Sequence, residues 1–126
     1  MKTVGYFDGT DSAVLAKIAA NGIYTIPLGN DWDGYGKIVT QIEPGEVDLI
    51  IAYLHKLLPP KDAETGPIPT PVNLLYRAKT YNIPVLIIVP KELHNKTKAI
   101  LGEAADFAEV ISPEDFDEKL CSILGI

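Results

Sequence analysis

Residues 47–54 read Val-Asp-Leu-Ile-Ile-Ala-Tyr-Leu, an almost unbroken apolar run with one charge near its start. A strand that faces water on one side shows polar residues at every second position, and this run does not. Strands that are apolar on both sides are typical of parallel sheets covered by helices on both faces. The run therefore predicts a buried strand in an α/β domain.

Four further short runs are rich in apolar residues and are separated by segments with helical spacing. The predicted strands are residues 3–7, 23–28, 47–54, 85–89 and 108–111. The spacing of apolar residues and the residues that favour helix ends, chiefly Ser, Asp, Gly and Pro, predict helices between them. The predicted helices are residues 12–20, 38–42, 70–82 and 93–101, with a last one beginning after Ser112-Pro113.

This alternation of strands and helices predicts the class of fold. Short connections that contain a helix join parallel strands through right-handed crossovers. We therefore expect a single domain over residues 1–126, a three-layer α/β/α sandwich with a five-stranded parallel sheet. Within the doubly wound, Rossmann-like arrangements, the flavodoxin-like strand order 2-1-3-4-5 is the one that we expect.

Composition excludes several classes of protein. The formal charge of −6 argues against nucleic-acid binding, because phosphates need a basic surface. Apolar runs stay well short of the ~18 residues of a membrane-spanning helix, and no signal peptide is expected before the strand that starts at Thr3. Cys121 is the only cysteine, which excludes an internal disulfide and fits a reducing compartment. We expect a cytoplasmic protein without a membrane partner.

The segment Asp8-Gly9-Thr10-Asp11-Ser12 joins the first predicted strand to the first helix. A glycine turn at the start of a helix exposes backbone N–H groups, which are natural anion ligands. Gly9, Thr10, Asp11 and Ser12 are therefore candidate ligand-binding residues, and Asp8 is a candidate catalytic residue. The alternative is an ordinary turn and helix cap, in which the same residue types are favoured.

Two nucleotide-binding families carry a similar loop. Residues 8–13 resemble the Asp-Gly-Ser opening of universal stress proteins, and Gly9, Asp11 and Ser12 resemble the end of the PP-loop ATPase motif. The later Gly-rich phosphate segment of the first family is absent after residue 89, and the Ser-Gly-Gly opening of the second is Phe7-Asp8-Gly9 here. We therefore assign the chain to neither family.

Acidic residues also follow the second predicted strand. Asp31 and Asp33 would come close to Asp8 if the first two strands are neighbours. Clustered carboxylates suit Mg²⁺, so these three residues form a candidate metal site. The alternative is a solvated acidic loop. Asn30 and Trp32 of the same loop are candidate ligand-binding residues, with the indole placed to stack on a flat ligand or to anchor the loop.

Both histidines follow strands that we expect to be adjacent. His55 comes directly after the third predicted strand, and His94 lies beyond the fourth. Because histidine exchanges protons near neutral pH, both are candidate catalytic residues; the alternative is a plain surface position. Asn73 opens the helix after the proline-rich connection 56–70, and we expect it to face the same crevice.

Two functions follow from this placement. The first is binding of a small anionic ligand, a nucleotide or a phosphorylated metabolite, at the carboxyl edge of the sheet. Asp8 and the histidines would then be able to support hydrolase or transferase chemistry. The second is a non-catalytic interaction or regulatory module that acts as a homodimer or as a subunit of a larger complex. The sequence leaves open whether the protein is an enzyme.

Overall fold

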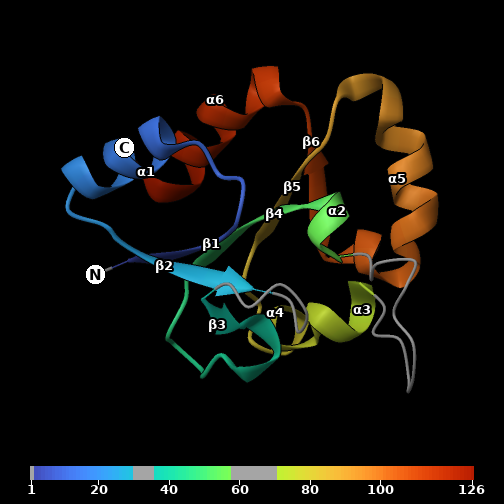
Figure 1. Cartoon of the computed structure of the whole chain (residues 1–126), viewed down its shortest axis with the longest axis horizontal. Helices are drawn as coiled ribbons and strands as arrows, with labels where there is room; N and C mark the ends of the chain where they lie inside the picture. The colour runs from blue at the N-terminus through green and yellow to red at the C-terminus, as the bar shows by residue number, and fades with distance from the viewer. Residues whose placement is uncertain (1, 30–35, 58–70) are drawn as a thin grey trace.

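The computed structural model describes residues 2–29, 36–57 and 71–126 (Figure 1). Its strands are β1 (Thr3–Phe7), β2 (Tyr24–Gly29), β3 (Lys37–Ile38), β4 (Leu49–Tyr53), β5 (Val85–Ile88) and β6 (Ala108–Ile111). Its α-helices are α1 (Ser12–Ala20), α2 (Leu54–Leu57), α3 (Pro71–Leu74), α4 (Tyr76–Thr80), α5 (His94–Leu101) and α6 (Pro113–Leu124). The 3₁₀ turns are η1 (Val39–Gln41), η2 (Lys91–Leu93) and η3 (Gly102–Asp106).

The strands form one parallel sheet in the order β3-β2-β1-β4-β5-β6. An α/β fold with a parallel sheet flanked by helices is therefore confirmed. The expected number of five strands is wrong, because β3 adds a sixth at the edge, beside Leu28 and Gly29 of β2. A strand of two residues gives no detectable alternation of apolar and polar residues, so the sequence pattern could not reveal it.

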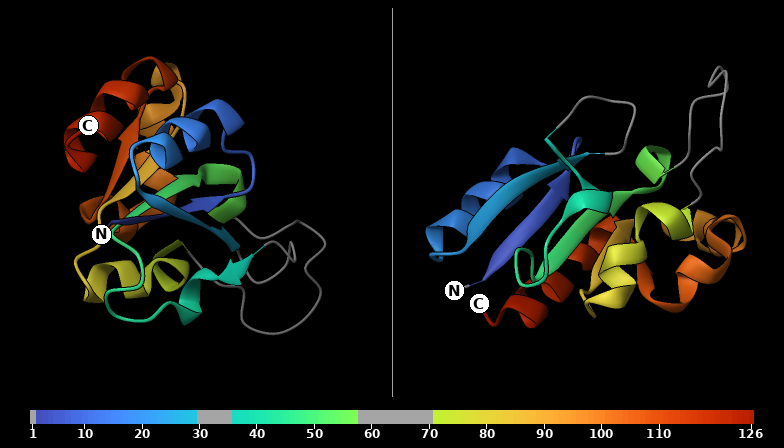
Figure 2. Two further views of the ribbon diagram at one scale, coloured as in Figure 1. Left: turned by 90° about the vertical axis from the view of Figure 1, so that its left-hand side faces the viewer. Right: turned by 90° about the horizontal axis from the view of Figure 1, so that it is seen from below.

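Helices cover both faces of the sheet (Figures 1 and 2). Leu49 and Ile51 of β4 pack with residues of α1 and α6, whereas Ile50 and Ala52 face the core shared with α3, α4 and α5. All four of these β4 side chains are fully buried, as expected for a strand that is apolar on both sides.

Two predicted helices differ from the structure. Residues 38–42 form the end of β3 and the turn η1 instead of an α-helix. The β-branched residues Ile38, Val39, Thr40 and Ile42 lose side-chain freedom in a helix, which favours this result. The helix expected over residues 70–82 is divided into α3 and α4 at Leu75, whose φ and ψ are −98° and 11°.

A close backbone approach holds β3 against β2. Gly36 precedes β3 with a φ of +60°, and a Cβ at this position would collide with the carbonyl group of Pro27. Pro27 lies in β2, just before the two residues that pair with β3. A proline fits there because no described strand pairs with the outer side of β2 at that point. Glycine is thus required at position 36 for both conformation and space.

Candidate functional site

The carboxyl ends of β1 and β4 lie side by side, because the two strands are parallel neighbours with Tyr6 opposite Ile51. The loop 8–11 leaves the end of β1 and leads into α1, while α2 begins directly after Tyr53. In open α/β sheets this edge is where ligands bind. The candidate site is built around these two strand ends.

Internal hydrogen bonds hold the loop between β1 and α1. Thr10 Oγ1 donates to the carbonyl oxygen of Phe7 at 2.8 Å, and the Thr10 N–H reaches the same oxygen at 3.4 Å. Asp11 is the N-cap of α1, and its Oδ1 accepts from the Ala13 N–H at 2.9 Å. Thr10 and Asp11 therefore have the local turn and capping bonds that the alternative interpretation of this segment describes.

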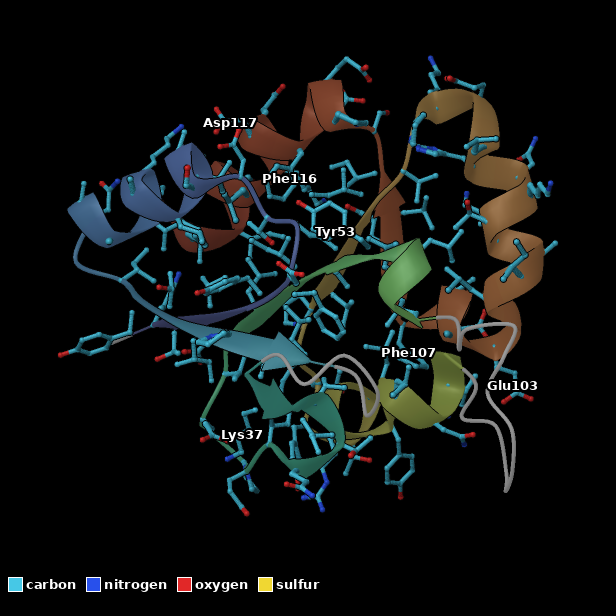
Figure 3. All side chains as sticks on the ribbon, viewed as in Figure 1. Lys37, Tyr53, Glu103, Phe107, Phe116 and Asp117 are labelled. Atoms are coloured by element: carbon cyan, nitrogen blue, oxygen red, sulfur yellow. The ribbon has the colours of Figure 1, made fainter. Side chains whose placement is uncertain are left out.

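Tyr53 joins this loop to the end of β4. Its side chain is hydrogen-bonded to that of Thr10, and a Cβ placed on Gly9 would lie 3.8 Å from Cδ2 and Cε2 of the ring. Figure 3 shows the side chain between β4 and the loop that enters α1. The tyrosine thus covers Gly9, whose φ of +103° gives the loop its turn.

The surroundings of Tyr53 stabilise its protonated form. Partial burial raises the pKa of the phenol above its ordinary value, and the negative charge of Asp11 acts in the same direction. The hydrogen bond with Thr10 acts the other way without reversing the shift. At neutral pH Tyr53 is therefore a neutral hydroxyl that can donate a hydrogen bond. Tyr53 was not among the candidate site residues predicted from the sequence, although the sequence places it near the end of a buried strand.

The charge beside α1 is negative. Asp8, Asp11 and Ser12 are exposed near the start of the helix, and the Asp11 carboxylate accepts from an N–H of its first turn. Carboxylates weaken the attraction of a helix N-terminus for a bare anion. An anionic ligand would bind here more tightly with an accompanying cation, or with hydroxyl groups of its own that donate hydrogen bonds to the carboxylates.

His94 is tied to the end of β5. Its Nε2 lies 2.7 Å from the carbonyl oxygen of Val89, and the half-buried imidazole begins α5. Because a carbonyl oxygen only accepts, Nε2 carries the proton and Nδ1 is the acceptor of the neutral ring. This bond fixes the imidazole at the carboxyl edge.

The other candidate residues are placed in part or not at all. His55 lies in α2, directly after β4, but its side chain is outside the described part of the structure. Asn73 is an exposed residue of α3. Asn30, Asp31, Trp32 and Asp33 all lie outside the described residues. A shared cleft for Asp8, His55, Asn73 and His94 therefore stays a prediction.

Metal binding stays a prediction as well. Within residues 2–29, 36–57 and 71–126, no group of three or more His, Cys, Asp or Glu side chains is placed to hold a metal ion. The proposed partners of Asp8 are Asp31 and Asp33, which are not among those residues.

Four hollows formed by described residues lie around β6 and near the amino ends of β5 and β6. One of about 360 Å³ is lined by Lys98 and by residues 105–110, on the side of α5. Another of about 280 Å³ lies beside α6 and is lined by Ile111, Asp115, Glu118, Lys119 and Ser122.

Among the described helices, none has the length and apolar character needed to cross a membrane. Comparison with known proteins gives no family: the sequence matches no protein-family model and no curated protein.

Proposed function

We propose that this domain binds a small anionic ligand, a nucleotide or a phosphorylated metabolite, between the β1–α1 loop and the end of β4. The observation that carries the proposal is the hydrogen bond between Thr10 and Tyr53. It joins two adjacent strand ends at the N-terminus of α1. The proposal includes the interpretation of the fold as flavodoxin-like, since ligands in such folds bind at this edge of the sheet.

The chemistry of the site favours a particular kind of ligand. The Ser12 hydroxyl and the N–H groups that open α1 can donate to phosphate oxygens, while Thr10 and Tyr53 hold the loop through their own hydrogen bonds. Asp8 and Asp11 repel bare phosphate but accept from ribose hydroxyls or bind a bridging Mg²⁺. A nucleotide accompanied by Mg²⁺ therefore fits better than inorganic phosphate.

Catalysis is a further part of the same proposal. Asp8 and the Nδ1 atom of His94 are the groups that we assign to proton transfer at a bound phosphorylated ligand, together with His55. Proton transfer by such side chains commonly accelerates a reaction by about 10²–10⁴-fold. The ligand-binding step does not depend on this assignment and is tested separately.

The test is a thermal-shift and calorimetric panel of nucleotides and flavins, each measured with and without Mg²⁺. A true ligand at a hundredfold excess over its dissociation constant stabilises the fold by ~2.7 kcal/mol. Thr10→Val and Tyr53→Phe should each weaken binding by roughly tenfold, the equivalent of 1.4 kcal/mol. Tyr24→Phe, at an exposed position of β2, is the matched control and should bind as the wild type does. A panel without any shift contradicts the proposal.

A second candidate function is a non-catalytic interaction module, which the notable hollows beside β6 favour. These hollows flank an edge strand whose outer side pairs with no described strand. Its test is the state of association of the ligand-free protein, measured over a range of concentrations.

A further inference from the structure

The hydrogen bonds between β5 and β6 are interrupted at the carboxyl edge of the sheet. The Val89 N–H donates to the carbonyl oxygen of Ile111 at 2.9 Å, directly after the pairing of Ile88 with Ile111. In a parallel ladder with this bond, the Val89 carbonyl group next accepts from the N–H two residues beyond Ile111. That residue is Pro113, which has no N–H to donate. The sequence therefore removes the ladder partner of the Val89 carbonyl.

The interruption comes from the proline itself. Ser112 still has an extended backbone, with φ and ψ of −75° and 151°, so the chain continues from β6 toward Pro113. Pro113 is also the first residue of α6, a position that proline favours because its fixed φ suits a helix start. Pro113 thus starts the helix and, at the same time, withholds a donor from the sheet.

His94 supplies the donor that Pro113 lacks. Its Nε2 lies 2.7 Å from the Val89 carbonyl oxygen, and His94 is the first residue of α5. Val89 is buried in the core shared with α3, α4 and α5, where an unpaired carbonyl group costs free energy. The imidazole N–H therefore takes the place of a backbone N–H at the end of the ladder.

We infer that Pro113 is a positioning residue for His94: it leaves the Val89 carbonyl to the Nε2–H group and so fixes the tautomer in which Nδ1 accepts protons. Within the described part of the chain, Nδ1 has no hydrogen-bond partner, and the ring is half-buried at the carboxyl edge. A neutral imidazole held by one nitrogen can take up a proton at the other. Only the transfer of a proton from a ligand rests on the proposed function.

The direct experiment is nitrogen-15 nuclear magnetic resonance of the His94 ring in the ligand-free protein, at a mildly alkaline pH. The expected spectrum shows a proton on Nε2 that exchanges slowly with water, and no proton on Nδ1. Pro113→Ala returns a backbone donor to the Val89 carbonyl and should speed exchange of the Nε2 proton by about tenfold. Pro84→Ala, at an exposed position before β5, is the matched control and should leave this exchange unchanged.

A double-mutant cycle tests the same substitution of donors through stability. His94→Ala should raise the unfolding equilibrium constant by about tenfold, because the Val89 carbonyl loses its donor. Combined with Pro113→Ala, the effect of His94→Ala should be clearly smaller, since the new N–H at position 113 can donate instead. Combined with Pro84→Ala, the effect of His94→Ala should be unchanged.

Two amide substitutions separate the nitrogens of the ring. The amide nitrogen of His94→Gln has about the reach of Nε2 and can still donate to Val89, whereas that of His94→Asn ends nearer the backbone. The glutamine variant should therefore unfold like the wild type, and the asparagine variant should unfold like His94→Ala. A glutamine variant as unstable as His94→Ala contradicts the assignment of Nε2 as the donor.

The wild-type spectrum can overturn the inference without any variant, by showing the slowly exchanging proton on Nδ1. Unchanged exchange of the Nε2 proton in Pro113→Ala also overturns it, because a proline that only starts α6 has no influence on the His94 ring. Additive losses of stability for His94→Ala and Pro113→Ala contradict it as well. None of these measurements includes a ligand, so their failure is distinct from a failure of binding at the β1–α1 loop.

Discussion

The side chains of Tyr53 and Thr10 form a hydrogen bond that connects the carboxyl ends of two adjacent strands, β4 and β1. The same Thr10 hydroxyl donates to Phe7, so the bond fixes both the loop and the tyrosine. The bond therefore ties the two strand ends together at the place where we propose that the ligand binds.

Tyr53→Phe should cost about 0.5–1.5 kcal/mol of stability at neutral pH, because a partly buried hydrogen bond is lost. The pKa of Tyr53 is raised in the folded protein, mainly by burial. Its contribution is fully present below the ordinary tyrosine pKa of about 10 and is lost as the pH rises through the higher folded value. Urea unfolding should therefore show a steeper alkaline loss for the wild type than for Tyr53→Phe.

The control for this alkaline effect is Tyr24→Phe, since Tyr24 is 62% exposed. Its pH profile should follow that of the wild type. If stability falls with rising pH equally in the wild type and in Tyr53→Phe, the pKa of Tyr53 is not raised in the folded protein.

Glu46 stabilises the turn before β4, and its contribution to stability should be larger at neutral pH than in acid. Lys37 Nζ contacts its two carboxylate oxygens at 2.8 and 2.9 Å, and the Glu43 N–H donates to Oε1 at 2.9 Å. The lysine, and then this N–H, lower the pKa of Glu46. Its contribution is present above the ordinary glutamate pKa of about 4.3 and is lost as the pH falls through the lower folded value.

Glu46→Gln should therefore cost about 0.5–1.5 kcal/mol near neutral pH and less in acid, measured by urea unfolding at several pH values. Glu103→Gln, at an exposed position in η3, is the control and should stay within about 0.5 kcal/mol of the wild type. A Glu46→Gln deficit that is constant from neutral to acidic pH would exclude the ion pair as its cause.

Gly36→Ala should destabilise the β2–β3 contact more than Gly45→Ala destabilises its own turn. Both glycines have positive φ, +60° and +78°, so both substitutions strain the backbone by about 1–3 kcal/mol. At Gly36 the added Cβ collides with the Pro27 carbonyl, whereas at Gly45 it meets no atom within 4 Å from the described residues beyond its chain neighbours. Equal losses in thermal unfolding would mean that this close approach is not present in solution.

Ile51→Ala should cost about 2–5 kcal/mol, since Ile51 is fully buried in a central strand and the substitution leaves a cavity. Ile88→Ala should lower the free energy of unfolding by less than Ile51→Ala does. From the sequence we would expect Ile88 to be equally buried, but it ends β5 at the margin of the core and is only partly buried. Ile100→Ala, at an exposed position of α5, is the surface control in the same unfolding measurement.

The buried strands were predictable because their pattern depends on residues close in sequence. Residues 47–54 are apolar on both faces, and β4 lies between β1 and β5 as such a pattern requires. β3 was not predictable, since it exists only through its pairing with Leu28 and Gly29 and the close approach of Gly36 to Pro27. Contacts between distant segments leave no local periodicity.

The sequence predicted that the candidate site lies at the carboxyl ends of the strands, but not the contacts within it. Thr10 and Asp11 lie at the carboxyl edge as the turn residues indicated, but their hydrogen bonds to Phe7 and Ala13 depend on local geometry. Tyr53 was missed because only the pairing of β1 with β4 brings it to Thr10. Its aromatic character alone fits a core position equally well.

The most direct test of the proposed ligand site is a map of backbone amide shifts by nuclear magnetic resonance during titration with nucleotides and Mg²⁺. The proposal predicts saturable shifts at Gly9, Thr10, Ser12 and Ala13 and at Leu54 beyond Tyr53, which Thr10→Val weakens. Shifts confined to β6 and α6, or no saturable shift with any nucleotide, would contradict a ligand site at the carboxyl edge.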